Sequence, residues 1–278
     1  PSGQRPAGGR RMATMGPRSL FEKIWDPHAV RELGDGSSLI AIDRIFLHER
    51  TGSVALKSLA ESGRPVLDPS RVFCTMDHIV DTTPGRGDAT RVPGGSAFIL
   101  ETRSAAEAAG IRVFDVRDPL QGIVHVISPE LGLVLPGATV VCPDSHTCTP
   151  GAMGAFAWGI GSPEAEHALA TGTLRIKRPR TMRISVEGRL APAVTAKDLA
   201  LHILARYGAA GGRGCAVEYA GGAVRALDME ARMTLCNMAT EFSAMTALIA
   251  PDETTFSYLR GRRYAPQGAL FERAMGVW

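Results

Sequence analysis

Long apolar runs and lysine are scarce in this 278-residue chain. No apolar run approaches the ~18 residues that a membrane-spanning helix needs, so we expect no membrane partner. The net charge is only +3, and the one basic run, RIKRPRTMR (175–183), has no interleaved aromatic residue to stack a base. Both observations argue against a nucleic-acid partner. With 45% hydrophobic and 21% charged residues, the composition is that of an ordinary soluble globular protein.

Cysteine is also sparse, and its odd number argues against a disulfide framework. The chain has five cysteines, an odd number without a secretion signal: Cys74, Cys142, Cys148, Cys215 and Cys236. We interpret them as reduced thiols of a cytoplasmic protein. Residues 1–18 are basic at their start, and we expect a disordered tail, a leader or an upstream start there.

Apolar strand-like runs alternate with helical patterns through the rest of the chain. We expect helices over 19–33, 54–62, 96–110, 195–208 and, rich in Gly and Ala, within 151–172. We expect strands over 38–43, 71–78, 111–116, 138–144 and 181–188. This alternation predicts an α/β sandwich formed by residues 19–278. A boundary within it is possible near 175–182, where the basic run interrupts the pattern.

Two predicted strands end in neighbouring Asp and His residues. These are Asp77-His78 in TMDHIVDT and Asp144-Ser145-His146 in VVCPDSHTCTPG, and a third histidine, His125, lies in QGIVHVISPELG. An Asp beside a His fixes its tautomer and raises its pKa, which suits a general acid. Taken alone, the second group could equally be a turn that caps the next helix.

A helix predicted over 229–245 places Asn237 and Glu241 four residues apart on one face. They could form an exposed hydrogen-bonded pair, but their apolar neighbours favour a half-buried pair that faces another part of the molecule or a ligand. Other histidines give weaker signals. His28, His48 and His202 cannot be separated by sequence from ordinary surface or core residues. His167 lies in EAEHALA, on a predicted surface helix without the second histidine of a zinc site.

Together these segments resemble a known family. MDHIVDT, QGIVHVISPELG, VVCPDSHTCTPGAMGAFAWGIGSPEAEHALATGTL, MTLCNMATEF and APDETTFSYLRGR are similar to the large subunits of 3-isopropylmalate dehydratases, within the aconitase superfamily. The resemblance runs from about Leu20 to Trp278 and implies an aconitase-type three-layer α/β/α sandwich.

The resemblance also implies a chemistry and a set of roles. It implies a [4Fe-4S]-dependent hydro-lyase that isomerises 2- to 3-isopropylmalate in leucine biosynthesis, with a small subunit carrying a swivelling domain as partner and a small hydroxy-dicarboxylic acid as substrate. The implied catalytic residues are Asp77, His78, His125, Asp144, His146 and Glu241. Ser145 would bind substrate, and Asn237 would line the cluster pocket.

The chain departs from the family pattern in two respects. The SCTN and CxxC motifs that hold the family's cluster are absent, so we expect a chain cut before the cluster-binding cysteines, with no metal ligand of its own. Residues 82–96 and Ser243, Met245 and Leu248 also differ from the usual pattern. Alternatives are therefore a related dehydratase of methylmalate, dimethylmalate or homocitrate, or a cluster-free fragment that acts as a binding module.

Overall fold

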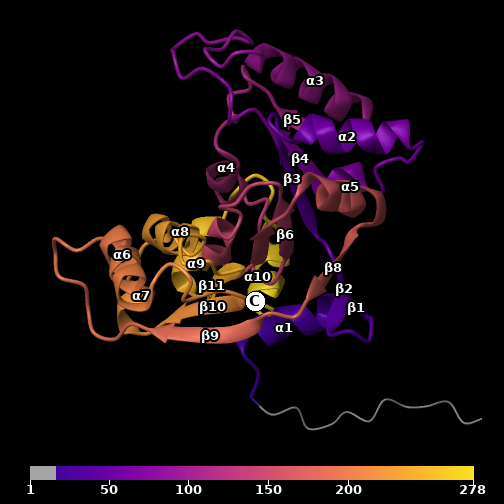
Figure 1. The fold of residues 1–278 in the computed structure, drawn as a ribbon. Coiled ribbons are helices and arrows are strands. Elements are labelled where there is room, and N and C mark those ends of the chain that lie inside the picture. The colour runs from indigo at the N-terminus through magenta and orange to yellow at the C-terminus, as the bar shows by residue number, and fades with distance from the viewer. Residues whose placement is uncertain (1–16) are drawn as a thin grey trace, which may run out of the picture.

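The computed structural model describes residues 17–278, so the expected tail or leader lies almost entirely outside the described residues. A five-stranded, all-parallel sheet lies at the centre of a mixed α/β fold (Figure 1). Its strands are, in spatial order, β5 (Arg112–Phe114), β4 (Val72–Thr75), β3 (Arg44–His48), β6 (Thr139–Cys142) and β7 (Phe156–Gly159).

Successive side chains of this sheet enter two different apolar cores. In β3, Phe46 belongs to one core, whereas its neighbours Ile45 and Leu47 belong to the other. The core around Leu47 contains side chains of α2 (Gly52–Glu61), α3 (Gly95–Ala108) and α5 (Ser162–Thr171). The core around Phe46 contains side chains of α4 (Val124–Glu130). Both faces of the sheet are therefore buried, as parallel sheets require.

Two smaller sheets complete the fold. A parallel sheet has the order β11 (Thr246–Ile249), β10 (Cys215–Ala220), β9 (Arg180–Ser185). It lies beside α6 (Ala196–Tyr207), α7 (Gly222–Arg225) and α8 (Met229–Asn237) at the lower left of Figure 1. An antiparallel sheet joins β1 (Ala29–Glu32), β2 (Ser37–Ala41) and β8 (Thr173–Lys177).

The remaining elements are short. They are α1 (Leu20–His28), α9 (Glu253–Leu259), α10 (Ala269–Met275) and two 3-10 helices, Pro69–Arg71 and Thr149–Met153. The chain passes from one sheet to another between Lys177 and Arg180, inside the predicted boundary region. The apolar core that contains Phe46 also contains Val217, which lies beyond residues 177–180 in the chain. A domain boundary near 175–182 therefore stays a prediction.

Two predicted elements among residues 19–172 were wrong in part. The helix expected over 19–33 ends at His28, because the following residues leave the helix to pair with β2. The region 151–172, expected to be helical, contains the strand β7. Gly154, at φ 78°, ends the preceding 3-10 helix in the left-handed region, and Phe156 and Trp158 are then buried on one face of the sheet. Burial decided this segment, since its Gly and Ala content favours neither structure.

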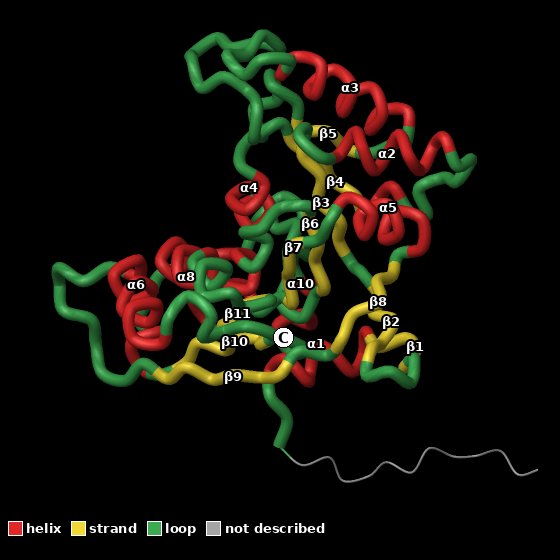
Figure 2. The backbone as a smooth tube through the Cα atoms, viewed as in Figure 1, coloured by secondary structure: helices red, strands yellow, loops and turns green. Residues whose placement is uncertain are grey.

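Among residues 17–278, no helix combines the length and the apolar character needed to cross a bilayer. Figure 2 shows that long loops follow β4 and β5 on the same side of the molecule, next to α3 and α4. These loops follow the carboxyl ends of the strands, which is where ligands bind in open parallel sheets.

Candidate active site

The predicted Asp and His residues meet at one edge of the five-stranded sheet. Asp77-His78 follows β4, and Asp144-Ser145-His146 follows β6. These strands are both neighbours of β3, and all three run parallel. The carboxyl ends of parallel neighbours share an edge, so residues 66 positions apart in the chain come within hydrogen-bonding distance.

His78 lies between two carboxylates. Its Nδ1 is 2.6 Å from Asp77 Oδ1 and its Nε2 is 2.8 Å from Asp144 Oδ2. The other oxygen of Asp144 is 2.7 Å from His125 Nε2, so Asp144 joins two imidazoles. The second oxygen of Asp77 accepts the backbone N–H of Val124 at 2.8 Å, which fixes this carboxylate next to α4.

The hydrogen bonds in this network control the charge of its members. Those with Asp144 and Asp77 raise the pKa of His78 to about 10, so this imidazole is protonated at neutral pH. Burial alone would raise the pKa of Asp144, but the hydrogen bonds from His125 and His78 outweigh it and hold this pKa well below its usual range. The site therefore contains an imidazolium cation held beside the ionised carboxylate of Asp144.

The segment after β6 is a tight turn built by its own polar groups. Asp144 Oδ1 accepts the backbone N–H of His146 at 2.7 Å, and the Asp144 carbonyl accepts the Thr147 hydroxyl at 2.7 Å. Ser145 is exposed, with its hydroxyl 3.1 Å from His146 Nδ1. The predicted turn is thus present, but its side chains do not cap the following 3-10 helix, which begins after Cys148 without a side-chain cap. The turn presents Ser145 and His146 at the edge of the sheet.

The helix predicted over 229–245 is shorter than expected. It ends at Asn237, and Glu241 lies in a series of tight turns that runs to Ser243, whose φ of 62° is left-handed. Phe242 is buried, and its carbonyl accepts the N–H of Gly212, so a tertiary contact draws the chain out of the helix. The predicted relation of Asn237 and Glu241 as neighbours on a helix face is therefore wrong.

Asn237 and Glu241 nevertheless both lie near the turn that follows β6, Asp144-Ser145-His146. Glu241 Oε1 is 3.6 Å from His146 Nε2, an ion-pair distance longer than a hydrogen bond, and both side chains are partly exposed. Asn237 donates its side-chain N–H to the Thr149 hydroxyl at 2.9 Å. Asn237 thus anchors α8 to the segment that follows His146.

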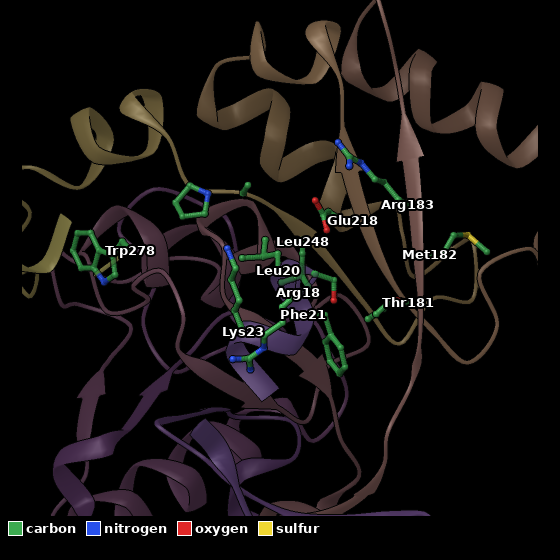
Figure 3. Close-up of a pocket in the computed structure, with 14 residues that line it drawn as sticks. Arg18, Leu20, Phe21, Lys23, Thr181, Met182, Arg183, Glu218, Leu248 and Trp278 are labelled. Atoms are coloured by element: carbon green, nitrogen blue, oxygen red, sulfur yellow. The ribbon is translucent and has the colours of Figure 1, made fainter. Parts of the chain in front are cut away.

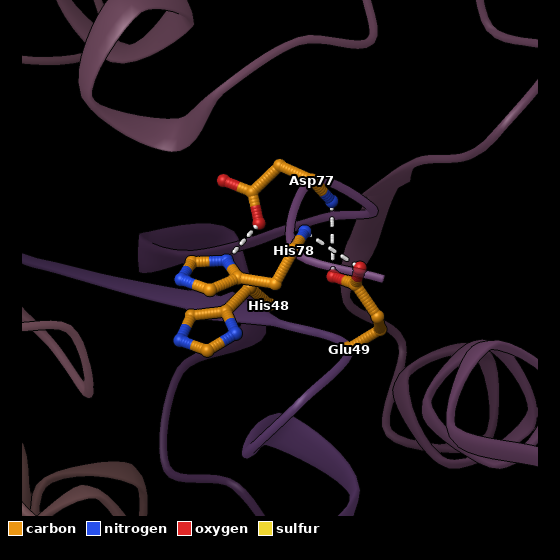
Figure 4. A group of neighbouring side chains, drawn as sticks. All are labelled: His48, Glu49, Asp77 and His78. Carbon is orange, nitrogen blue, oxygen red and sulfur yellow. Dashed lines mark hydrogen bonds and ion pairs between the residues drawn. The ribbon is translucent and has the colours of Figure 1, made fainter. Parts of the chain in front are cut away.

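Sequence analysis missed a third strand-end pair, His48-Glu49, at the end of β3 (Figure 4). The His48 ring stacks on that of His78, with centroids 3.8 Å apart and planes 14° from parallel. Burial and the charge of His78 lower the pKa of His48, so the neutral form is favoured. The signal was available: RIFLHE is an apolar run ending in a polar pair, as in the two strands that were recognised.

These four side chains have the spacing of a metal site, but of their potential ligand atoms only His48 Nδ1 lacks a hydrogen-bond partner. Ligand atoms of His48, Glu49, Asp77 and His78 all lie within 4.8 Å of one another. However, the Glu49 oxygens face backbone N–H groups, and both nitrogens of His78 face carboxylates. A cation here would have to displace these bonds and approach a charged imidazolium, so we assign no metal to this cluster.

The cysteines do not fit an iron–sulfur cluster. All five are buried: Cys74, Cys142, Cys148, Cys215 and Cys236. Burial raises the pKa of Cys148 to about 12, and it also raises the pKa values of Cys74, Cys142 and Cys236 above the usual range. Thiolates are the form that binds iron, so these four thiols with raised pKa values are poor ligands, and Cys215 is also buried.

Of two cavities in the described residues, one is lined by residues of this site and the other is not. One of about 420 Å³ opens beside Ser145 and is also lined by Thr240, Ile160 and Met245. Another, of about 500 Å³, lies between α1 and the sheet of β9, β10 and β11 (Figure 3). None of the described residues lining the second cavity belongs to the predicted site, so the first is the one adjacent to the chemistry.

Comparison with known proteins identifies the family of this chain. The family model described as the aconitase family (aconitate hydratase) matches residues 22–278. The 3-isopropylmalate dehydratase large subunit 1 of Bradyrhizobium diazoefficiens is 50% identical over 271 residues, which cover 98% of this chain and 56% of the relative. The chain thus spans about half the length of that curated relative. A match from residue 22 to residue 278 shows that the chain belongs to the aconitase family.

Proposed function

We propose that this chain is part of a hydro-lyase large subunit that isomerises 2- to 3-isopropylmalate by dehydration and rehydration. The observation that carries the proposal is the position of His78 between Asp77 and Asp144 at the strand edge, with His125 on the far side of Asp144. The 50% identity to a protein named as a 3-isopropylmalate dehydratase large subunit supports this substrate.

In the proposed reaction, Asp77 and His78 deliver a proton to the departing hydroxyl, which leaves as water. A base outside these residues would take the proton from the neighbouring carbon as the double bond forms. His78 holds its proton while substrate binds, because its pKa is raised to about 10. Transfer is still favourable in the transition state, since a departing hydroxide is a far stronger base than imidazole. One oxygen of Asp144 then stabilises the proton that remains on the His78 ring. Its other oxygen holds His125 near the oxygen of the departing hydroxyl.

The exposed groups of the site have binding roles in this proposal. Ser145 donates a hydrogen bond to a substrate oxygen, and His146 with Glu241 forms a third imidazole–carboxylate pair at the rim. The neighbouring cavity, with polar Ser145 and Thr240 and apolar Ile160 and Met245, fits a hydroxy acid that carries an alkyl group. Asn237 supports the rim through Thr149.

We further propose that the cofactor and the partner come from outside these residues. Membership of the aconitase family implies an iron–sulfur cluster in full-length members. Because all five described cysteines are buried, we assign the ligands of this cluster to residues outside this chain. The relative's designation as a large subunit implies a small subunit, which we propose as the partner of this protein also. We also interpret the sheet between two helix-lined cores as the aconitase-type three-layer sandwich.

The test is an activity assay of the full-length protein, assembled anaerobically with its small subunit. We expect interconversion of 2- and 3-isopropylmalate, followed by the ultraviolet absorbance of the unsaturated acid. Methylmalate, dimethylmalate and homocitrate are the comparison substrates. A preference for one of these three acids would replace 2-isopropylmalate as the proposed substrate. A His78→Asn variant that keeps its activity on all four substrates would contradict the proposed chemistry.

A further inference from the structure

Glu49 is a carboxylate in an unusual environment for a charge. The residue follows His48 at the end of β3 and is 0% exposed. Burying an ionised carboxylate is costly unless polar groups replace the lost water. Its surroundings should therefore show what the charge is for.

Three consecutive backbone N–H groups provide that replacement, and Figure 4 shows two of them, those of Asp77 and His78. Glu49 Oε2 accepts from Asp77 at 2.9 Å, and Oε1 accepts from His78 at 2.7 Å and also from Ile79. Successive N–H groups that converge in this way form an anion-binding nest. One side chain thus satisfies the whole turn in which β4 leaves the sheet.

This turn carries the two groups on which the proposed chemistry depends most. Asp77 and His78 are held by Glu49 through their backbones and by Val124 N–H and Asp144 through their side chains. The ring of His78 also lies on the buried ring of His48, from the same strand end as Glu49. The direction of the His78 ring is therefore set from β3, not by β4 alone.

We propose that Glu49 is a positioning residue for catalysis, which fixes the Asp77-His78 turn so that His78 faces both Asp77 and Asp144. This inference rests on the proposed function for its consequence but not for its geometry. A glutamine in place of Glu49 has one acceptor oxygen and presents an N–H₂ group to the remaining backbone donor. The turn should then shift away from that group, and the two His78 hydrogen bonds should lengthen.

The test compares Glu49→Gln with Glu22→Gln in the full-length protein. Glu22 is a matched control because its carboxylate also accepts a backbone N–H, from Ser19 at 2.9 Å, at the start of α1. The first readout is the pKa of His78, measured by NMR on the cluster-free protein with labelled histidine rings. In Glu49→Gln it should fall from about 10 toward the ordinary value of about 6.5, and in Glu22→Gln it should not change.

The second readout is turnover of the assembled enzyme. Misplacement of a catalytic group by about 1 Å costs on the order of 10²-fold, so Glu49→Gln should lose about 10- to 100-fold in kcat with a smaller change in KM. Glu49→Asp keeps the charge but reaches fewer of the donors, and it should lose less of both kcat and His78 pKa. It also serves as the second variant if Glu49→Gln folds poorly.

The outcomes separate this inference from the proposed function. An unchanged His78 pKa in both Glu49 variants would overturn the positioning role, whatever the turnover. Failure of both variants to fold would assign Glu49 to folding alone and would overturn it as well. A lowered His78 pKa in a protein whose wild type shows no dehydratase activity would support the positioning role and contradict the proposed function.

Discussion

At the scale of single residues, the histidines of this chain differ in how deeply their side chains are buried. His48 is almost fully buried beneath His78, His125 is buried against Asp144, and His146 is 37% exposed at the rim. His167 is exposed on α5. A histidine that lines an open site can contact substrate directly, whereas one on an outer helix face cannot.

We therefore predict that His146→Asn lowers turnover of the assembled enzyme by on the order of 10²-fold, the usual cost of losing a general-acid or charge-stabilising group. His167→Asn should change turnover by no more than a few-fold. Glu241→Gln should resemble His146→Asn, because Glu241 is the carboxylate nearest to that imidazole. Steady-state kinetics of the three variants provide the measurement. A dead His167→Asn beside a normal His146→Asn would contradict the assigned site.

At the scale of elements, one histidine–carboxylate pair joins the end of α1 to the start of β3. His28 Nε2 is 2.8 Å from Asp43 Oδ2, and Asp43 also accepts the backbone N–H of Thr139 at 2.9 Å. The hydrogen bond with Asp43 raises the pKa of His28. Burial would raise the pKa of Asp43, but its bonds with His28 and Thr139 lower it. The ion pair thus connects α1 to the start of β3, and the hydrogen bond from Thr139 connects Asp43 to β6.

This geometry predicts a pH-dependent contribution to stability. His28 has a higher pKa in the folded than in the unfolded state, so its contribution is complete below about pH 6.5 and is lost as the pH rises through the folded value. Asp43 has the opposite shift, so its contribution is lost in acid. We expect His28→Gln to lower the free energy of unfolding more at pH 6 than at pH 9, measured by urea denaturation.

The matched control for this pH dependence is His202→Gln, since His202 is exposed on α6. That variant should show the same difference from wild type at both pH values. If the cost of His28→Gln is equal at pH 6 and pH 9, the pair with Asp43 does not contribute through its charge.

At the scale of the whole molecule, the apolar cores determine where cysteine chemistry can occur. Cys74 lies in the core on one face of the central sheet, and the other four described cysteines belong to the core on its opposite face or to its extension: Cys142, Cys148, Cys215 and Cys236. Iron and bulky thiol reagents reach such positions only when the fold opens.

We predict that the 278-residue chain, incubated anaerobically with iron and sulfide, develops no visible absorption of an iron–sulfur cluster. Its thiols should react with a thiol reagent in urea and only slowly in the native state, because all five are buried. Absorption spectra and timed thiol titration are the measurements. A stoichiometric cluster on this chain would show that some of these cysteines are ligands after all.

The sequence by itself determined the α/β class, most strands of the central sheet, the family and the residues at the ends of β4 and β6. These signals are local: apolar runs predict buried strands, and polar groups directly after such runs predict a site at a sheet edge. The roles of the single site residues remain predictions, since only variants of the complete protein can test them.

Only the tertiary structure decided which strand ends are neighbours and what each polar side chain faces. The order β4-β3-β6 inserts His48 and Glu49 between the two recognised pairs, and no local pattern in RIFLHE contains that order. Likewise, α8 ends at Asn237 because Phe242 packs against residues 30 positions earlier in the chain. Helical spacing predicts only contacts within a helix, whereas contacts between distant segments depend on how the sheets and cores assemble.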